Sequence, residues 1–110
     1  MTDPLAYVSI ADTTTPDGIC TIDVKGELDV FNVAAFEEAL DRASGSKVLI
    51  VDLRQCRYID SSSISALIRA RKKTGDKIRI VADGGSVRRV LTLTHLEDVI
   101  PVASSPEELS

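Results

Sequence analysis

Hydrophobic and polar residues alternate along two early segments of the chain. The clearer alternation covers residues 19–25, with apolar side chains at every second position: Cys20, Ile22 and Val24. A period of two is typical of a strand with one buried and one exposed face. A weaker alternation covers residues 7–11, and the Pro-Asp-Gly sequence at 16–18 favours a turn between the two segments. The pattern therefore predicts an opening β-hairpin.

Helical spacing appears in three later segments. Apolar residues recur every three or four positions after Asn32, over residues 62–73, and after Ser86. Asn32 and Ser86 are typical N-cap residues and are expected to open their helices. Residues 105–108, Ser-Pro-Glu-Glu, form a capping box, which predicts a short fourth helix.

Three more strands are expected between and after these helices. Residues 48–51 are all apolar, as in a central strand buried on both faces. Strands at 78–82 and 99–102 follow, and residues 54–59 are predicted to be an irregular connector. The element order β-β-α-β-α-β-α-β predicts an α/β fold, with a mixed sheet of about five strands covered by about four helices. We expect one domain spanning residues 1–110.

Composition narrows the class of protein. The chain is 44% hydrophobic and 27% charged, as in a globular protein, and its net charge of −4 argues against a nucleic-acid surface. Neither a signal peptide nor an apolar run of about 20 residues occurs, which predicts a cytoplasmic protein that does not insert into a membrane. Cys20 and Cys56 are far apart in the sequence and are expected to be free, reduced core residues.

The most distinctive chemistry lies where the second helix begins, in the polar run Asp60-Ser61-Ser62-Ser63. One such residue suffices to cap a helix, so the run exceeds what capping requires. A helix N-terminus also offers free N–H groups and a positive dipole end, and so tolerates a phosphoryl group. The carboxyl ends of parallel strands share one rim, so this run and the Glu27-Leu28-Asp29 loop are expected to meet there. Simple capping and phosphorylation both remain open interpretations.

An ordered set of motifs extends over most of the chain. It consists of residues 26–29 (Gly-Glu-Leu-Asp), an apolar strand ending in Asp52-Leu53, and residues 58–62 (Tyr-Ile-Asp-Ser-Ser), 78–81 and 86–96. From about residue 7 to residue 109, this set resembles the STAS domain of bacterial anti-sigma factor antagonists.

The resemblance implies a regulatory protein of transcription and stress response, not an enzyme. It implies that Ser61 is phosphorylated by a partner that is both an anti-sigma factor and a serine kinase. The unmodified protein would bind this partner and free a sigma factor; phosphorylation would end the complex, and a serine phosphatase would restore it. No cofactor or metal is implied. The implied partner surface comprises Glu27, Asp29, Asp60, Ser61, Ser62, Ser63 and Ser65.

The chain departs from the family pattern at Ser63 and Ser65, where the family usually has glycines, and at His95, where a glycine often ends the third helix. The extra serines leave Ser62 and Ser63 as rival phosphorylation sites. The replaced glycines also favour a second interpretation, in which the domain is a scaffold subunit of a stress-sensing complex or an accessory subunit of a membrane transporter.

Two other interpretations have weaker support. A receiver-like domain would use Asp52 as its phosphoacceptor, but the opening strand lacks the paired acids that would hold Mg²⁺. A catalytic triad of Ser61, His95 and Asp60 would need a strained nucleophile turn, and no G-x-S-x-G sequence is present. Asp60 is also adjacent to Ser61, so it cannot orient a distant histidine. We therefore expect no catalytic residues.

Overall fold

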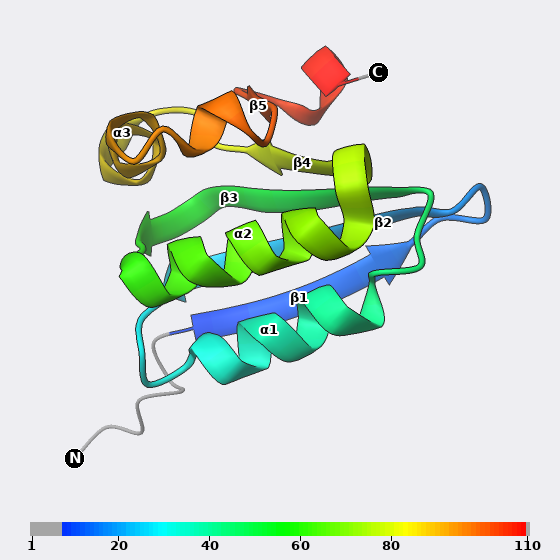
Figure 1. Cartoon of the computed structure of the whole chain (residues 1–110), viewed down its shortest axis with the longest axis horizontal. Coiled ribbons are helices and arrows are strands. Elements are labelled where there is room, and N and C mark those ends of the chain that lie inside the picture. The colour runs from blue at the N-terminus through cyan, green and yellow to red at the C-terminus, as the bar shows by residue number, and fades with distance from the viewer. Residues whose placement is uncertain (1–7, 110) are drawn as a thin grey trace.

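The computed structural model describes residues 8–109 and contains a five-stranded mixed sheet (Figure 1). Strands β1 (Val8–Thr14) and β2 (Ile19–Glu27) form an antiparallel hairpin. Strands β3 (Val48–Tyr58), β4 (Ile78–Val81) and β5 (Val102–Ala103) follow in parallel, and the spatial order is β1-β2-β3-β4-β5. The predicted hairpin and mixed sheet are confirmed; Tyr7, which we placed in the first strand, lies outside the described residues.

Three α-helices connect the parallel strands: α1 (Val33–Arg42), α2 (Ser61–Thr74) and α3 (Gly85–Leu93). Each parallel strand lies one position further across the sheet than its predecessor. Because such crossovers are right-handed, all the connecting helices belong on the same face of the sheet. Figure 1 shows α1 and α2 side by side in front of it.

One-sided helical cover explains the burial pattern of the strands. In β2, Cys20, Ile22 and Val24 are buried, and the residues between them are half-buried, as the alternation predicted. In β3, Leu49 and Val51 are buried, but Val48 and Ile50 are only half-buried. Our expectation that this strand is buried on both faces was wrong, because no helix within residues 8–109 covers the second face. Cys20 and Cys56 are both buried and free, as expected.

Several element boundaries also differ from the predicted ones because of tertiary contacts. The predicted connector at 54–59 is wrong up to Tyr58, because β3 continues along β2 past two register shifts, to the pair Glu27–Tyr58. The last strand begins at Val102 rather than at 99, because the N–H groups of Val99 and Ile100 donate to the Leu96 carbonyl of the 3₁₀ turn η3 (Leu96–Asp98).

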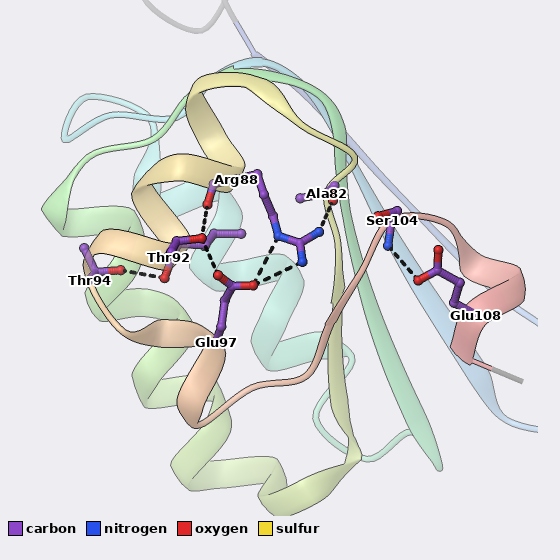
Figure 2. Close-up of polar contacts among 8 residues, drawn as sticks. Ala82, Arg88, Thr92, Thr94, Glu97, Ser104 and Glu108 are labelled. Carbon is purple, nitrogen blue, oxygen red and sulfur yellow. Dashed lines mark hydrogen bonds and ion pairs between the residues drawn. The ribbon is translucent and has the colours of Figure 1, made fainter.

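Two expected caps differ from prediction. Gly84, not Ser86, is the N-cap of α3, and the Ser86 hydroxyl instead donates to the Arg57 carbonyl. The expected fourth helix is a single 3₁₀ turn, η4 (Pro106–Leu109); Glu108 reaches back to the Ser104 N–H at 3.2 Å (Figure 2). Residues 8–109 thus contain three α-helices with short 3₁₀ turns, one helix fewer than predicted.

Helix α3 is fastened to the end of β4 by one side chain (Figure 2). The Arg88 guanidinium donates to the Ala82 carbonyl at 2.8 Å and to the Glu97 carboxylate at 3.2 Å. The Thr92 hydroxyl donates to the same carboxylate, and this bond, ahead of the nearby arginine, lowers the pKa of Glu97. The network joins the end of β4, α3 and η3.

Candidate functional site

β2, β3 and β4 are parallel, so their carboxyl ends lie at the same end of the sheet. We call this end the carboxyl rim; it is made of residues 27–32, 57–63 and 83–86. The Leu28 N–H donates to the Tyr58 carbonyl at 2.9 Å, which joins the first two segments. The Ser86 hydroxyl donates to the Arg57 carbonyl at 2.8 Å, which joins the third. The expectation that the two polar loops meet at one rim is therefore confirmed.

Asp60 is the N-cap of α2. Its backbone is extended, and its Oδ1 accepts hydrogen bonds from the Ser63 N–H at 3.1 Å, the Ser63 hydroxyl at 3.1 Å and the Ser62 hydroxyl at 2.5 Å. Burial raises the pKa of the Asp60 carboxyl, but the hydrogen bonds from Ser62 and Ser63 together hold it below its usual value. Asp60 is therefore a carboxylate at neutral pH, and capping uses its Oδ1.

The three serines after Asp60 have different environments. Ser63 is completely buried and Ser62 is half-buried, and both hydroxyls are bonded to Asp60. Ser61 is exposed, and its hydroxyl makes no hydrogen bond within residues 8–109. Ser65 is exposed one turn later on α2. Ser61 is thus the one member of this triplet with a free hydroxyl facing solvent.

The replacement of a usual glycine by Ser63 is accommodated inside the helix start. The Ser63 side chain is buried without an unsatisfied polar atom, because its hydroxyl shares the Asp60 carboxylate with the backbone. The substitution therefore adds a hydrogen bond to the cap and leaves the outer surface of the rim unchanged.

The loop between β2 and α1 is held by the buried Asn32. Its side-chain N–H donates to the Glu27 carbonyl at 2.9 Å, and its Oδ1 accepts from the Asp29 N–H at 3.0 Å. Asn32 is the N-cap residue by position, as predicted, but its side chain makes no capping bond to α1. The Asp29 carboxylate accepts from the Phe31 N–H at 2.9 Å, so it stabilises its own loop.

This loop presents apolar side chains to solvent. Val30 is 64% exposed and Phe31 is 76% exposed, and Tyr58 in the adjoining segment is 50% exposed. We call Val30, Phe31 and Tyr58 the apolar trio. The sequence analysis missed these residues. The available signal was that Val30 and Phe31 are two adjacent apolar residues between the polar Asp29 and Asn32, just before the helical pattern of α1. Exposed apolar side chains on adjoining segments of a protein surface typically mark an interaction site.

The rim also carries charge. Arg57 and Glu27 form an exposed ion pair at 3.9 Å, which contributes little to stability. With Asp29 and Asp60, the described rim has more acidic than basic residues. A further negative charge there would meet repulsion.

Other candidate residues lie away from the rim. Asp52 is well inside β3, opposite Asp23 and Val81, and its carboxylate accepts from the Arg54 guanidinium at 2.7 Å. Burial raises the pKa of Asp52, but its bonds to Arg54 outweigh burial and lower it overall. His95 follows the C-terminal end of α3, where it takes the left-handed conformation at φ 60° and its Nδ1 lies 3.4 Å from Asp98.

Two kinds of site find no support in the described part of the chain. No group of three or more His, Cys, Asp or Glu side chains within residues 8–109 is placed to hold a metal ion. None of the helices described there is long and apolar enough to cross a membrane.

The groove between α1 and α2 is bridged by the ion pairs Arg69–Glu37 and Lys73–Asp41, at 3.2 and 2.7 Å. Its charged groups are already satisfied.

Comparison with known proteins places this arrangement in context. An anti-sigma-B factor antagonist of Staphylococcus aureus is 29% identical over 101 residues, which cover 87% of this chain and 94% of that protein. Among solved structures, an anti-sigma factor antagonist from Mycobacterium paratuberculosis has a TM-score of 0.86 at 24% identity, covering 98% of this chain and 94% of that chain.

Two solved structures of SpoIIAA, a Bacillus cell fate determinant, resemble this chain. Its unphosphorylated form has a TM-score of 0.76 and its phosphorylated form 0.66, each at 16% identity and over 92% of this chain. These alignments cover 93% and 96% of the respective SpoIIAA chains. The sequence profile of the STAS domain matches residues 11–109. The chain therefore belongs to the STAS domain family.

Proposed function

We propose that this protein is an anti-sigma factor antagonist that binds its partner through the carboxyl rim and is switched off by phosphorylation of Ser61. The names of its relatives support the class of partner. The observation that carries the proposal is the exposed Ser61 hydroxyl at the start of α2, which makes no hydrogen bond to residues 8–109 and lies on the rim that also presents the apolar trio. The proposed activity is regulated binding, and the rim needs no cofactor for it.

The apolar trio supplies the binding energy in this proposal. Phe31 and Tyr58 are large, exposed aromatic residues on neighbouring segments of one rim. Aromatic side chains at the centre of an interface commonly dominate its affinity. Asn32 holds the Phe31 loop through two hydrogen bonds, so little conformational freedom remains to be lost on binding.

A phosphate on Ser61 would reverse this binding without unfolding the domain. It adds about −1.5 to −2 charges at neutral pH, on a rim that already holds Glu27, Asp29 and the ionised Asp60. Burying that charge in an apolar interface carries a large desolvation cost. The same phosphate at the start of α2 is compatible with the helix dipole and the free N–H groups of the first turn. The switch would therefore change the surface while the fold persists.

Accessibility supports Ser61 over its rivals as the phosphorylation site. A kinase must reach a hydroxyl and orient it toward its phosphate donor. Ser63 is completely buried and both Ser62 and Ser63 donate to Asp60, so modifying either one would remove a hydrogen bond from the carboxylate that caps α2. Because Asp60 is occupied in this way, we assign it a positioning role, with Ser61 left free.

The partners in this proposal are an anti-sigma factor with serine kinase activity and a serine phosphatase. The unphosphorylated protein would sequester the anti-sigma factor and free a sigma factor for RNA polymerase. The alternative role in a scaffold or a transporter rested on the replaced glycines. Ser63 fits the cap without altering the rim surface, which weakens the case for that role at one of the two replaced glycines; the other, Ser65, is exposed on α2.

The test combines phosphate mapping with binding. We would phosphorylate the protein with its cognate anti-sigma factor kinase, locate the phosphate by tandem mass spectrometry, and compare Ser61→Ala with the matched control Ser65→Ala. We expect one phosphate, lost only in Ser61→Ala, and at least 100-fold weaker binding of the phosphorylated form to the anti-sigma factor. Unchanged affinity after phosphorylation, or a phosphate confined to Ser62 or Ser63, would contradict the proposal.

A further inference from the structure

The two edges of the sheet are protected to different degrees. β5 is only two residues long, follows Pro101, and leads into η4, so it offers little backbone for pairing. β1 is seven residues long and pairs with β2 in unbroken register, from Val8–Gly26 to Thr14–Cys20. No strand of residues 8–109 pairs with the outer edge of β1.

β1 has few of the devices that usually keep an exposed edge from pairing. Val8–Thr14 contains no lysine, arginine or proline, and its register with β2 has no bulge, whereas the β2–β3 register shifts twice. Its one charge is Asp12, and the Arg42 guanidinium lies 3.4 Å from that carboxylate. A long, regular and nearly neutral edge is a template for another strand.

We propose that β1 pairs with β1 of a second copy of this chain, joining the two sheets across a twofold axis. A twofold contact of one edge with itself makes the two strands antiparallel, so their N–H and C=O groups can form a regular ladder. With Ala11 on the axis, Ser9 faces Thr13 of the second copy, and Val8 faces Thr14. Asp12 faces Ile10, so the two carboxylates are not directly opposed.

Side-chain size and charge make the second copy a suitable occupant. The residues of β1 are small or β-branched apart from Asp12, whose charge is paired with Arg42, so no bulky side chain of β1 blocks approach along the edge. A contact of one strand pair buries less area than a permanent dimer needs, so the dimer should be weak and should form reversibly.

The pairing leaves both carboxyl rims available. Val8 lies beside Gly26, so β1 begins at the end of the sheet that carries the rim. Antiparallel β1 strands point the two domains in opposite directions, and the two Ser61 hydroxyls then lie at opposite ends of the dimer. Dimerisation is therefore independent of Ser61 and gives one dimer two separate rims.

Sedimentation velocity of the full chain between about 10 µM and 1 mM tests the dimer. We expect the mass to rise from that of the 11.8 kDa monomer toward twice that value, equally in wild type and in Ser61→Asp. Ala11→Lys and Ala11→Glu place like charges on the axis and should each remain monomeric, whereas their mixture should dimerise. Ser104→Lys, an exposed substitution near the opposite edge, should dimerise like wild type.

Each other outcome overturns the inference. If the chain stays monomeric up to about 1 mM, β1 does not pair with a second copy. A β1 that binds a strand of another protein instead would also leave the chain monomeric. A dimer that survives Ala11→Lys uses another surface, and a mixture that stays monomeric rules out the Ala11 axis. Circular dichroism before each run confirms that both Ala11 variants are folded, and these results leave the proposed role of Ser61 untouched.

Discussion

The side-chain amide of Asn32 donates to the main-chain carbonyl of Glu27 at 2.9 Å and so closes the loop that carries Phe31. Asn32 is 1% exposed and Phe31 is 76% exposed, which inverts the usual placement of polar and apolar residues. The buried amide satisfies the loop backbone, and the exposed ring is left for a partner. The stability of this loop and its binding role can therefore be tested separately.

Replacing Asn32 by alanine should lower the free energy of unfolding by about 1–3 kcal/mol, because the Asp29 N–H and the Glu27 carbonyl lose their buried partner. Urea unfolding monitored by circular dichroism measures this change. Glu38→Ala, an exposed substitution on α1, serves as the control and should stay within about 0.5 kcal/mol of wild type. Equal stability of both variants would show that Asn32 does not hold the loop.

Phe31→Ser should weaken binding to the anti-sigma factor by about 30-fold or more, as expected for an aromatic residue central to an interface. Its unfolding temperature should match wild type, since the ring contributes little to the core. Leu93→Ser is the matched control, because Leu93 is 69% exposed but ends α3 away from the rim. Isothermal titration calorimetry compares the two variants. Similar losses in both would remove the apolar trio from the interface.

Acid should destabilise the domain partly through Asp60. The pKa of Asp60 is lower in the folded protein than in the unfolded chain, because hydrogen bonds from Ser62 and Ser63 outweigh burial. Its stabilising effect is therefore complete above the unfolded pKa of about 3.9 and is lost as the pH falls through the folded pKa. Asp60→Asn keeps the accepting oxygen but cannot titrate, so its unfolding temperature should fall less between pH 7 and about pH 3.

The control for this pH dependence is Asp76→Asn, an exposed carboxyl that accepts no hydrogen bond within residues 8–109. Thermal unfolding of wild type and both variants at the two pH values gives the comparison. The prediction fails if Asp60→Asn loses as much stability in acid as wild type does.

His95→Gly should raise the free energy of unfolding by about 0.5–1 kcal/mol. His95 has φ 60° and ψ 20°, a left-handed conformation that glycine adopts without steric cost and that ends many helices. His95→Ala is the matched control, because it removes the same side chain but keeps the unfavourable Cβ. Chemical denaturation should order the variants glycine above histidine, and alanine no higher than histidine. A gain in both variants would instead assign the effect to the imidazole.

The errors in the predicted secondary structure lie near the ends of helices and strands. The connector predicted at 54–59 is strand because β2 lies beside it and supplies hydrogen-bond partners as far as Tyr58. Serine is a typical N-cap residue, yet the Ser86 hydroxyl donates to the Arg57 carbonyl, 29 positions earlier in the chain. Both errors come from contacts between distant segments, which a local pattern does not contain.

By itself the sequence determined the order of strands and helices, the mixed sheet, the polar start of α2 and the resemblance to the STAS family. These depend on periodicity and on motifs of neighbouring residues, which act locally. Only the tertiary structure decided that Ser63 is buried while Ser61 is exposed, that Asn32 holds the loop that carries Phe31, and that no strand of residues 8–109 covers the outer edge of β1. Burial and long-range hydrogen bonds set these features, because they arise only when segments far apart in the chain are brought together.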